Sequence, residues 1–232
     1  MRIQRAPKAI RWNERLGNAF ELATNDRPAA CPRERPHEQQ HTAPARACRR
    51  KWRRPRPKRL CGPGPDAEQK RLILEAASAA PDHEQIRPWR FVEVPENARA
   101  ALGHAFESAL TERDPDASEQ DCQQAREKAL RSPWLLLLVV RTGGQPPDIP
   151  ASERLLSAGA AVQNMLLMAA ALGLGSSLTS GKAIGSAVLA SLFRLGDQEQ
   201  AVCFLNFGHI GGARKERPRP AVSQYFSTLD IF

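Results

Sequence analysis

The sequence predicts a sandwich of helices around one β-sheet, of the α/β or, as we expect, the α+β class. Residues 134–141 (WLLLLVVR) form a continuous apolar run, which is typical of a central strand covered on both faces. Residues 153–172 form a helical pattern that is apolar on nearly all sides, as expected of a helix in a core or at a subunit interface. Because helical and extended patterns interleave along the chain, we expect the helices to pack around one sheet.

Charge divides the 232 residues into two parts. The formal net charge is +9, but residues 1–60 hold 17 of the 34 Lys and Arg and only 5 of the 25 Asp and Glu, so the rest of the chain is mildly acidic. Residues 1–60 are rich in Arg and Pro and poor in aliphatic residues, and burial could not offset the entropy of ordering them. We expect residues 1–60 to be a disordered or aberrant N-terminal segment and residues 61–232 to be the folded domain. An alternative role for the basic run at 49–54, in which cations flank one tryptophan, is a nucleic-acid-binding arm.

Cysteine usage and the apolar segments bear on the compartment. Five cysteines are scattered without C-x-x-C spacing, which favours reduced thiols in the cytoplasm. The first residues lack an apolar core of signal-peptide length. The pattern at 153–172 is interrupted by Gln163 and Asn164, so it does not suit a bilayer span of about 20 apolar residues. We expect a soluble, cytoplasmic protein.

The elements of the domain begin near Pro63. Asp66 and Gln69 form a D-x-x-Q pair that predicts a helix start, and Pro81 ends this helix. Amphipathic patterns predict further helices, and alternating or apolar runs predict strands. The expected helices cover 95–113, 118–131, 153–172 and 184–193. The expected strands cover 90–94, 134–141, 176–180 and 200–207.

Small residues mark the end of the long helix and its surface. Gly173 and Gly175 follow its last apolar residue, and glycine adopts the left-handed conformation at little cost, so they end the helix. Gly159, Ala160 and Ala161 are small enough for another backbone or a flat ligand to approach closely.

The sequence contains few of the usual signatures of chemistry. It has no G-x-S-x-G nucleophile motif, no phosphate-binding P-loop and no G-x-G-x-x-G after a strand. The five histidines form no metal-binding pattern, and we expect no metal. The remaining candidates are a loop with His83 and Arg87, the Gly/Ser turn at 173–181 and cations of the C-terminal tail. Backbone amides, small residues and cations of this kind could bind a flat anionic cofactor.

Three motifs carry a resemblance to a known family. Residues 77–91 fit A-x-x-A-P-D-H-x-x-x-x-P-W-x-F, residues 157–181 read SAGAAVQNMLLMAAALGLGSSLTSG, and residues 205–212 read LNFGHIGG. In this order and spacing they resemble the flavin loop, the central helix with its following strand, and the last strand of the nitroreductase family. The resemblance covers about 63–232 and is greatest to the small bacterial NAD(P)H nitroreductases.

The resemblance implies a fold, an activity and an assembly. The fold would be a mixed β-sheet sandwiched by helices, with the long central helix at a dimer interface. The protein would be a homodimer with FMN in each interface cleft, in which NAD(P)H reduces the flavin and a nitroaromatic, quinone or similar acceptor reoxidises it. FMN would carry the redox chemistry, so no catalytic side chain is expected. The alternatives are a nitroreductase-like protein with an impaired cofactor site, and a nucleic-acid adaptor that uses the basic arm.

The resemblance also assigns binding residues by position. The expected FMN contacts are Arg54, Arg56, His83, Arg87, Leu178, Thr179, Ser180, Lys215 and Arg217. The expected NAD(P) segment comprises Met168, Ala169, Ala170, Ala171, Leu172 and Gly173, for which a purely structural role in the core is the alternative.

The N-terminal phosphate motif departs most from the family. Arg54-Pro55-Arg56 stands where relatives have Arg-Arg-Ser, so the serine hydroxyl is replaced and Pro55 lacks a backbone donor. Thr179 stands where small relatives have an arginine, and Arg87 where they commonly have glutamine. The departures at Arg54-Pro55-Arg56 predict weakened binding of FMN.

Overall fold

The structure, a computed structural model, describes residues 55–211 and 219–229. The expectations for residues 1–54 and for Arg54, Lys215 and Arg217 lie outside the described residues. Regular structure begins with a short 3-10 turn, η1 (Pro57–Arg59), followed directly by β1 (Leu60–Cys61). None of the helices within 55–211 and 219–229 has the length and apolarity needed to cross a membrane.

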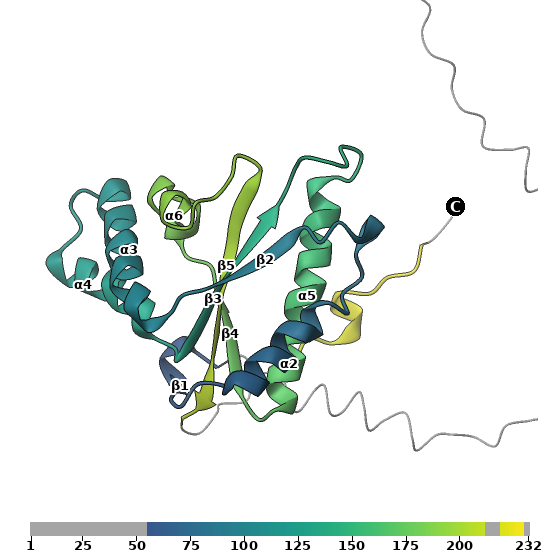
Figure 1. Cartoon of the computed structure of the whole chain (residues 1–232), viewed down its shortest axis with the longest axis horizontal. Coiled ribbons are helices and arrows are strands. Elements are labelled where there is room, and N and C mark those ends of the chain that lie inside the picture. The colour runs from purple at the N-terminus through teal and green to yellow at the C-terminus, as the bar shows by residue number, and fades with distance from the viewer. Residues whose placement is uncertain (1–54, 212–218, 230–232) are drawn as a thin grey trace, which may run out of the picture. The chain divides into compact units, whose positions relative to one another are not determined.

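One sheet lies at the centre of the domain (Figure 1). Besides β1 it contains β2 (Trp89–Glu93), β3 (Trp134–Arg141), β4 (Gly175–Thr179) and β5 (Glu199–Ile210). β5 pairs with β1, β3 and β4, and β3 also pairs with β2. The four predicted strands are therefore present, within a few residues of the predicted bounds.

The strand pairs differ from the mixed sheet that the resemblance implied. Every pair among the described strands is antiparallel. The path of the chain explains this, because β2 ends at Glu93, which pairs with Leu136 near the start of β3. The intervening helices thus return the chain to the end of the sheet that it left. The α+β class itself is confirmed.

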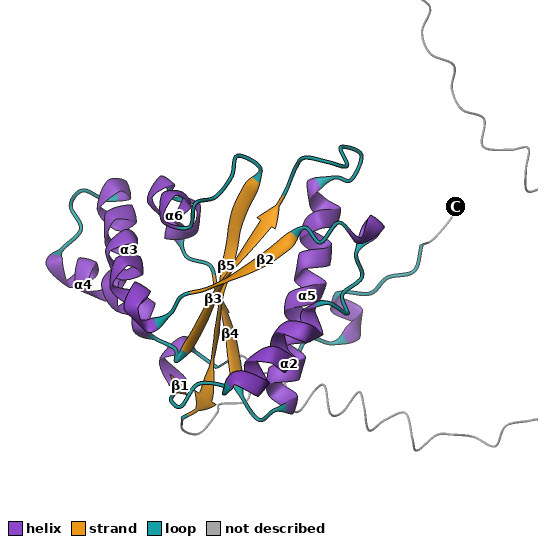
Figure 2. Ribbon diagram, viewed as in Figure 1, coloured by secondary structure: helices purple, strands orange, loops and turns teal. Residues whose placement is uncertain are grey.

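Helices cover both faces of the sheet (Figure 2). The helices are α2 (Ala67–Ala77), α3 (Arg99–Arg113), α4 (Glu119–Glu127), α5 (Ala151–Ala171) and α6 (Ala187–Leu192). Between α4 and β3 lies the 3-10 turn η4 (Lys128–Leu130), and between β4 and α6 lies η5 (Lys182–Gly185). Because side chains of a strand point alternately to the two faces, β3 contributes to two separate buried clusters.

The two clusters define the two faces. Leu136, Leu138 and Val140 pack with α2 and α5, on what we call the α2/α5 face. Leu135, Leu137 and Val139 pack with α3 and α6, on the α3/α6 face. The first seven residues of β3 are buried, which confirms the prediction of a central strand covered on both sides.

Helix α2 begins where the D-x-x-Q pair predicts. The backbone N–H of Gln69 donates to Asp66 Oδ1 over 2.8 Å, and the backbone N–H of Asp66 donates to Gln69 Oε1 over 3.0 Å. This reciprocal capping box satisfies two backbone donors that the first turn leaves without partners.

The long helix α5 has one buried and one exposed face. Its buried residues include Ala158, Ala161 and Met165, which pack against the sheet. On the other side Leu156 and Gly159 are exposed in the protomer. The expected core position is therefore confirmed for the buried face, and the exposed face carries small and aliphatic residues together with the polar Gln163.

The two glycines that follow α5 have different functions. Gly173 has a φ of +80°, as predicted for a residue that ends a helix in the left-handed conformation. Gly175 begins β4, and a Cβ atom there would lie 2.4 Å from Ile210 Cγ1 and 2.8 Å from Leu60 Cδ2. The second glycine is therefore required by close packing and not by its backbone conformation.

Candidate functional site

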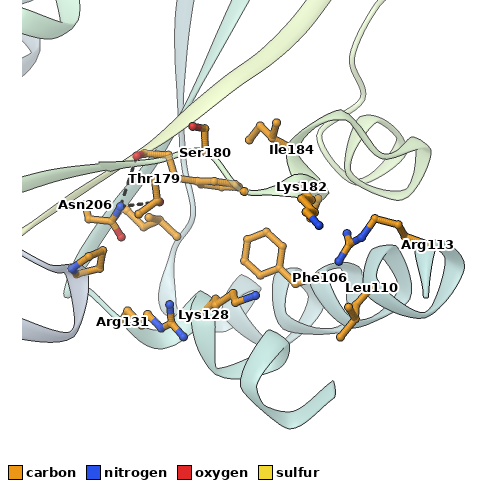
Figure 3. A pocket seen from close by; sticks show the side chains of 15 residues that line it. Phe106, Leu110, Arg113, Lys128, Arg131, Thr179, Ser180, Lys182, Ile184 and Asn206 are labelled. Carbon is orange, nitrogen blue, oxygen red and sulfur yellow. Dashed lines mark hydrogen bonds between the residues drawn. The ribbon is translucent and has the colours of Figure 1, made fainter. Parts of the chain in front are cut away.

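A cavity of about 470 Å³ lies on the α3/α6 face of the sheet (Figure 3). One wall is the chain that leaves β4, residues 179–184, and the wall facing it comes from α3 and η4. The apolar part of the lining belongs to the cluster of this face: Phe106, Leu135, Ala183, Ile184 and Phe204. The cavity thus offers an apolar space with one wall formed by a segment that the sequence marks as cofactor-binding.

Two of the predicted FMN residues, Thr179 and Ser180, line this cavity, whereas Leu178 packs against the core of the opposite face. Thr179 is held by Asn206 of β5, whose side-chain amide donates to Thr179 Oγ1 and to the Ser177 carbonyl, both over 3.1 Å. The Ser132 hydroxyl donates to Asn206 Oδ1 over 3.1 Å. Asn206 therefore fixes the end of β4 against β5 and the segment that precedes β3.

Four cations line the same cavity: Arg113, Lys128, Arg131 and Lys182. Its lining contains no Asp or Glu, and no described carboxylate forms an ion pair with any of the four. Burial lowers the pKa of the Lys128 ammonium, and the nearby charges of Arg131 and Arg113 lower it further. The cavity therefore carries positive charge that is not compensated by the described residues.

A second cavity, of about 630 Å³, lies on the α2/α5 face. It is lined by Arg87 and Asp82 of the loop before β2 and by core residues of that face: Ala77, Ala80, Trp89 and Phe91. Arg87 has a φ of +43°, and its backbone N–H donates to Asp82 Oδ2 over 2.7 Å. Asp82 Oδ1 is buried and forms no hydrogen bond within the described residues. A buried carboxylate oxygen of this kind is usually satisfied by an ordered water or by another bound donor.

His83 lies beside this loop and pairs with the long helix. Its Nδ1 lies 2.7 Å from Glu153 Oε2 in the first turn of α5. The hydrogen bond to Glu153 is the main cause that raises the pKa of the His83 imidazole above its ordinary value. Below the ordinary pKa the imidazole is charged and the full ion pair is present. The ion pair is then lost as pH rises through the raised pKa.

Replacing Glu153 by glutamine tests this pair. The variant removes the charge that favours imidazolium, so the pKa of His83 is expected to fall towards its ordinary value. Titration of the imidazole resonances by NMR measures the change. A matched variant, Glu75→Gln, removes an exposed carboxylate from α2 and should leave the His83 titration unchanged. An unchanged His83 pKa in Glu153→Gln would show that the ion pair is not formed in solution.

The structure separates the predicted FMN contacts instead of bringing them together. Thr179 and Ser180 lie at the cavity of the α3/α6 face, and Arg87 lies at the cavity of the α2/α5 face. The two cavities share no lining residue. Between β4 and β2 lie β5 and β3, which is three strand spacings, or about 14 Å. One protomer therefore does not place both sets of residues on one flavin.

The remaining predicted residues have other positions. Arg56 is exposed and directly precedes Pro57, which lines the cavity of the α3/α6 face. The predicted NAD(P) segment forms the last turn of α5 and the turn after it; Ala169 is buried, and Met168 and Leu172 pack against the α2/α5 core. This segment lines neither cavity.

Sequence reasoning missed most of the cavity. Asn206 had a visible signal, because it is a polar residue within an otherwise apolar strand. Lys182 follows the predicted segment by two residues and could have been included. Arg113, Lys128 and Arg131 had no such signal, since tertiary packing alone brings the end of α3 and η4 to the chain after β4.

Comparison with known proteins places the chain in a family. A family model described as "Nitroreductase family" matches residues 62–209. The chain is 30% identical over 160 residues to a Haemophilus influenzae protein named "Putative NAD(P)H nitroreductase", covering 69% of this chain and 85% of the relative. The chain belongs to the nitroreductase family, which confirms the resemblance read from the three motifs and the oxidoreductase class.

Further relatives agree at the level of sequence and fold. The chain is 33% identical over 150 residues to "Putative NAD(P)H nitroreductase YdjA" of Escherichia coli K12, covering 65% of this chain and 80% of the relative. The crystal structure of a nitroreductase-like protein from Bacillus cereus superposes with a TM-score of 0.68 at 18% identity, covering 79% of this chain and 95% of that one. A nitroreductase-type protein from Desulfovibrio desulfuricans, solved in complex with FMN, superposes with a TM-score of 0.59 at 22% identity, covering 81% and 97%.

Proposed function

We propose that the protein is an FMN-dependent NAD(P)H oxidoreductase that acts as a homodimer. The observation that carries the proposal is the separation of the predicted flavin contacts onto opposite faces of one sheet. Two protomers related by a twofold axis can present the α3/α6 cavity of one and the His83–Arg87 loop of the other to the same ligand. Each flavin would then lie in a cleft between subunits.

The exposed face of α5 supports this assembly. Leu156 is 75% exposed, and Leu155 is also exposed. Gly159 faces open space, because a Cβ atom built on it would have no heavy atom within 4 Å apart from the adjoining backbone of its own helix. A protomer that leaves aliphatic and small residues side by side on a long helix has a surface suited to close helix packing. Since the loop with His83 is tied to the first turn of α5, pairing of this helix would bring the loop to the interface.

The residues of the α3/α6 cavity fit FMN. An apolar lining suits the flavin ring, and the chain after β4 can offer backbone amides. Arg56 precedes a lining residue, so the N-terminal arginine can reach the phosphate even without the family's serine. When bound, FMN supplies hydride acceptance and donation, and the chain supplies position, charge and exclusion of water.

The acceptor class follows from the family resemblance. For a nitroaromatic acceptor, one NAD(P)H and one proton convert the nitro group to a nitroso group, with NAD(P)⁺ and water as the other products. Quinones and similar electron-poor rings are the other proposed acceptors. No side chain has to act as nucleophile, which agrees with the absence of a triad from the sequence.

A visible absorbance spectrum of the purified full chain, taken before and after loading with FMN and desalting, tests the proposal. We expect retained flavin, bleaching of its absorbance by NADH or NADPH under anaerobic conditions, and reoxidation by a neutral nitroarene. A protein that cannot be loaded would contradict the proposed function and favour a nitroreductase-like protein with an impaired cofactor site.

A further inference from the structure

The α3/α6 cavity is lined by cations that the resemblance does not assign to the cofactor. The resemblance assigns the FMN phosphate to Arg54, Arg56, Lys215 and Arg217; Arg56 does not line the cavity, and the other three lie outside the described residues. The cavity nevertheless contains four more cations, and no described carboxylate pairs with them. Arg113, Lys128 and Lys182 are exposed at the cavity, and like charges gathered around one apolar space favour a ligand that brings negative charge.

These cations lie beside apolar side chains in a definite order. In Figure 3 the charged ends of Arg113 and Lys182 point towards one end of the cavity, near Leu110, while Arg131 and Asn206 lie towards the other end. Arg113 is the last residue of α3 and Lys182 is the first residue of η5, and these two elements pack against each other. The ring of Phe106 lies between the two ends. A flat aromatic ligand with an anionic substituent matches an apolar centre with cations at both ends, of which Arg113 and Lys182 are the two whose charged ends point towards each other in this view.

We propose that Arg113 and Lys182 select electron acceptors that carry a carboxylate or a similar anionic group on an aromatic ring. This inference rests on the proposed function and names the acceptor class of the same site. The reaction is unchanged: a nitrobenzoate takes up two electrons and two protons, loses one oxygen as water and leaves as the nitrosobenzoate, while one NAD(P)H is oxidised. The carboxylate takes no part in bond changes and serves only to bind and orient the acceptor.

The test compares two acceptors of nearly equal shape, para-nitrobenzoate and the neutral para-nitrobenzamide. The ratio of their kcat/KM values is measured for the FMN-loaded wild type and for the double variant Arg113→Gln/Lys182→Gln. Differences in intrinsic reactivity between the acceptors cancel when the two ratios are compared. We expect the ratio to fall by about tenfold in the variant, the combined effect of two partly exposed ionic contacts. The dissociation constant of benzoate, measured from its perturbation of the flavin spectrum, should rise by a similar factor.

Controls separate this inference from the proposed function. FMN content, flavin reduction by NAD(P)H and turnover of the amide should stay unchanged in the double variant. Arg194→Gln, which removes an exposed cation outside the cavity, should leave the acceptor ratio unchanged. The single variants Arg113→Gln and Lys182→Gln serve if the double variant does not fold.

Three outcomes would overturn the inference. In the first, the flavin is bound and reduced but the acceptor ratio is the same in wild type and variants. In the second, the variants slow flavin reduction by NAD(P)H without changing the ratio, and the cations then bind phosphates of the donor. In the third, the wild type takes up no FMN, which overturns the proposed function and this inference together.

Discussion

Replacing Leu156 by glutamate is expected to separate the proposed homodimer and to abolish FMN binding. Leu156 lies on the exposed face of α5, where 75% of its surface is accessible in the protomer. In a twofold interface each substitution acts on both sides, and each would bury a carboxylate with no cation supplied for it. We expect the dimer dissociation constant to rise at least about a hundredfold, since burial of even one unpaired charge costs several kcal/mol. Flavin should be lost with the dimer, because each protomer holds only part of the contacts.

Sedimentation velocity and flavin absorbance measure the two effects on the same sample. Leu192→Glu is the matched control, since Leu192 is 41% exposed on α6, which covers the opposite face of the sheet. This control should remain dimeric and yellow. A Leu156→Glu protein that stays dimeric with full flavin would show that α5 is not at the interface. A wild type that binds flavin as a monomer would contradict the shared site.

Local signals explain why the fold could be predicted from the sequence. The capping box at Asp66 and Gln69 is a short-range pattern that the structure reproduces bond for bond. The apolar run of β3 is also a local signal: a strand covered on both faces needs an apolar residue at nearly every position, so its burial could be predicted from the residues alone. Whether paired strands are parallel is set by the path of the connections, so the antiparallel pairing could not be read from the strands themselves.

The site could be predicted only where it lies within one segment. Thr179 and Ser180 were identified because they belong to a continuous motif, and the structure places them at a cavity. The cations facing them come from the end of α3 and from η4, so their proximity is a product of packing that no spacing records. The motif with Arg87 was identified equally well, yet it lies on the other face of the sheet. A motif does not indicate on which face of the sheet its residues lie.

Replacing Arg154 by methionine is expected to cause a large loss of stability. Arg154 is only 1% exposed, although it belongs to the first turns of an otherwise apolar helix. Its Nε donates to the Ile149 carbonyl over 3.0 Å, and its Nη2 donates to the carbonyls of Gly144 and Pro146 over 3.1 and 2.6 Å. One side chain thus satisfies three carbonyls of the loop between β3 and α5, and methionine fills similar space without a donor.

The expected cost is about 3 kcal/mol, since one buried and two partly buried carbonyls each lose a hydrogen bond to a charged donor worth about 1 kcal/mol or more. For a domain of this size that corresponds to a fall in melting temperature of roughly 10 °C. Arg154→Lys should recover little, because one ammonium cannot span three acceptors as the planar guanidinium does. Arg141→Met is the control: its Nη2 forms a single exposed hydrogen bond to the Ile86 carbonyl, and its loss should change stability by less than about 1 kcal/mol. Thermal and urea denaturation of the three variants measure the difference, and equal stability of Arg154→Met and Arg141→Met would show that the guanidinium does not hold the loop.

Because this loop leads into the first turn of α5, where Glu153 pairs with His83, its loosening should also shift the His83 titration towards the ordinary pKa.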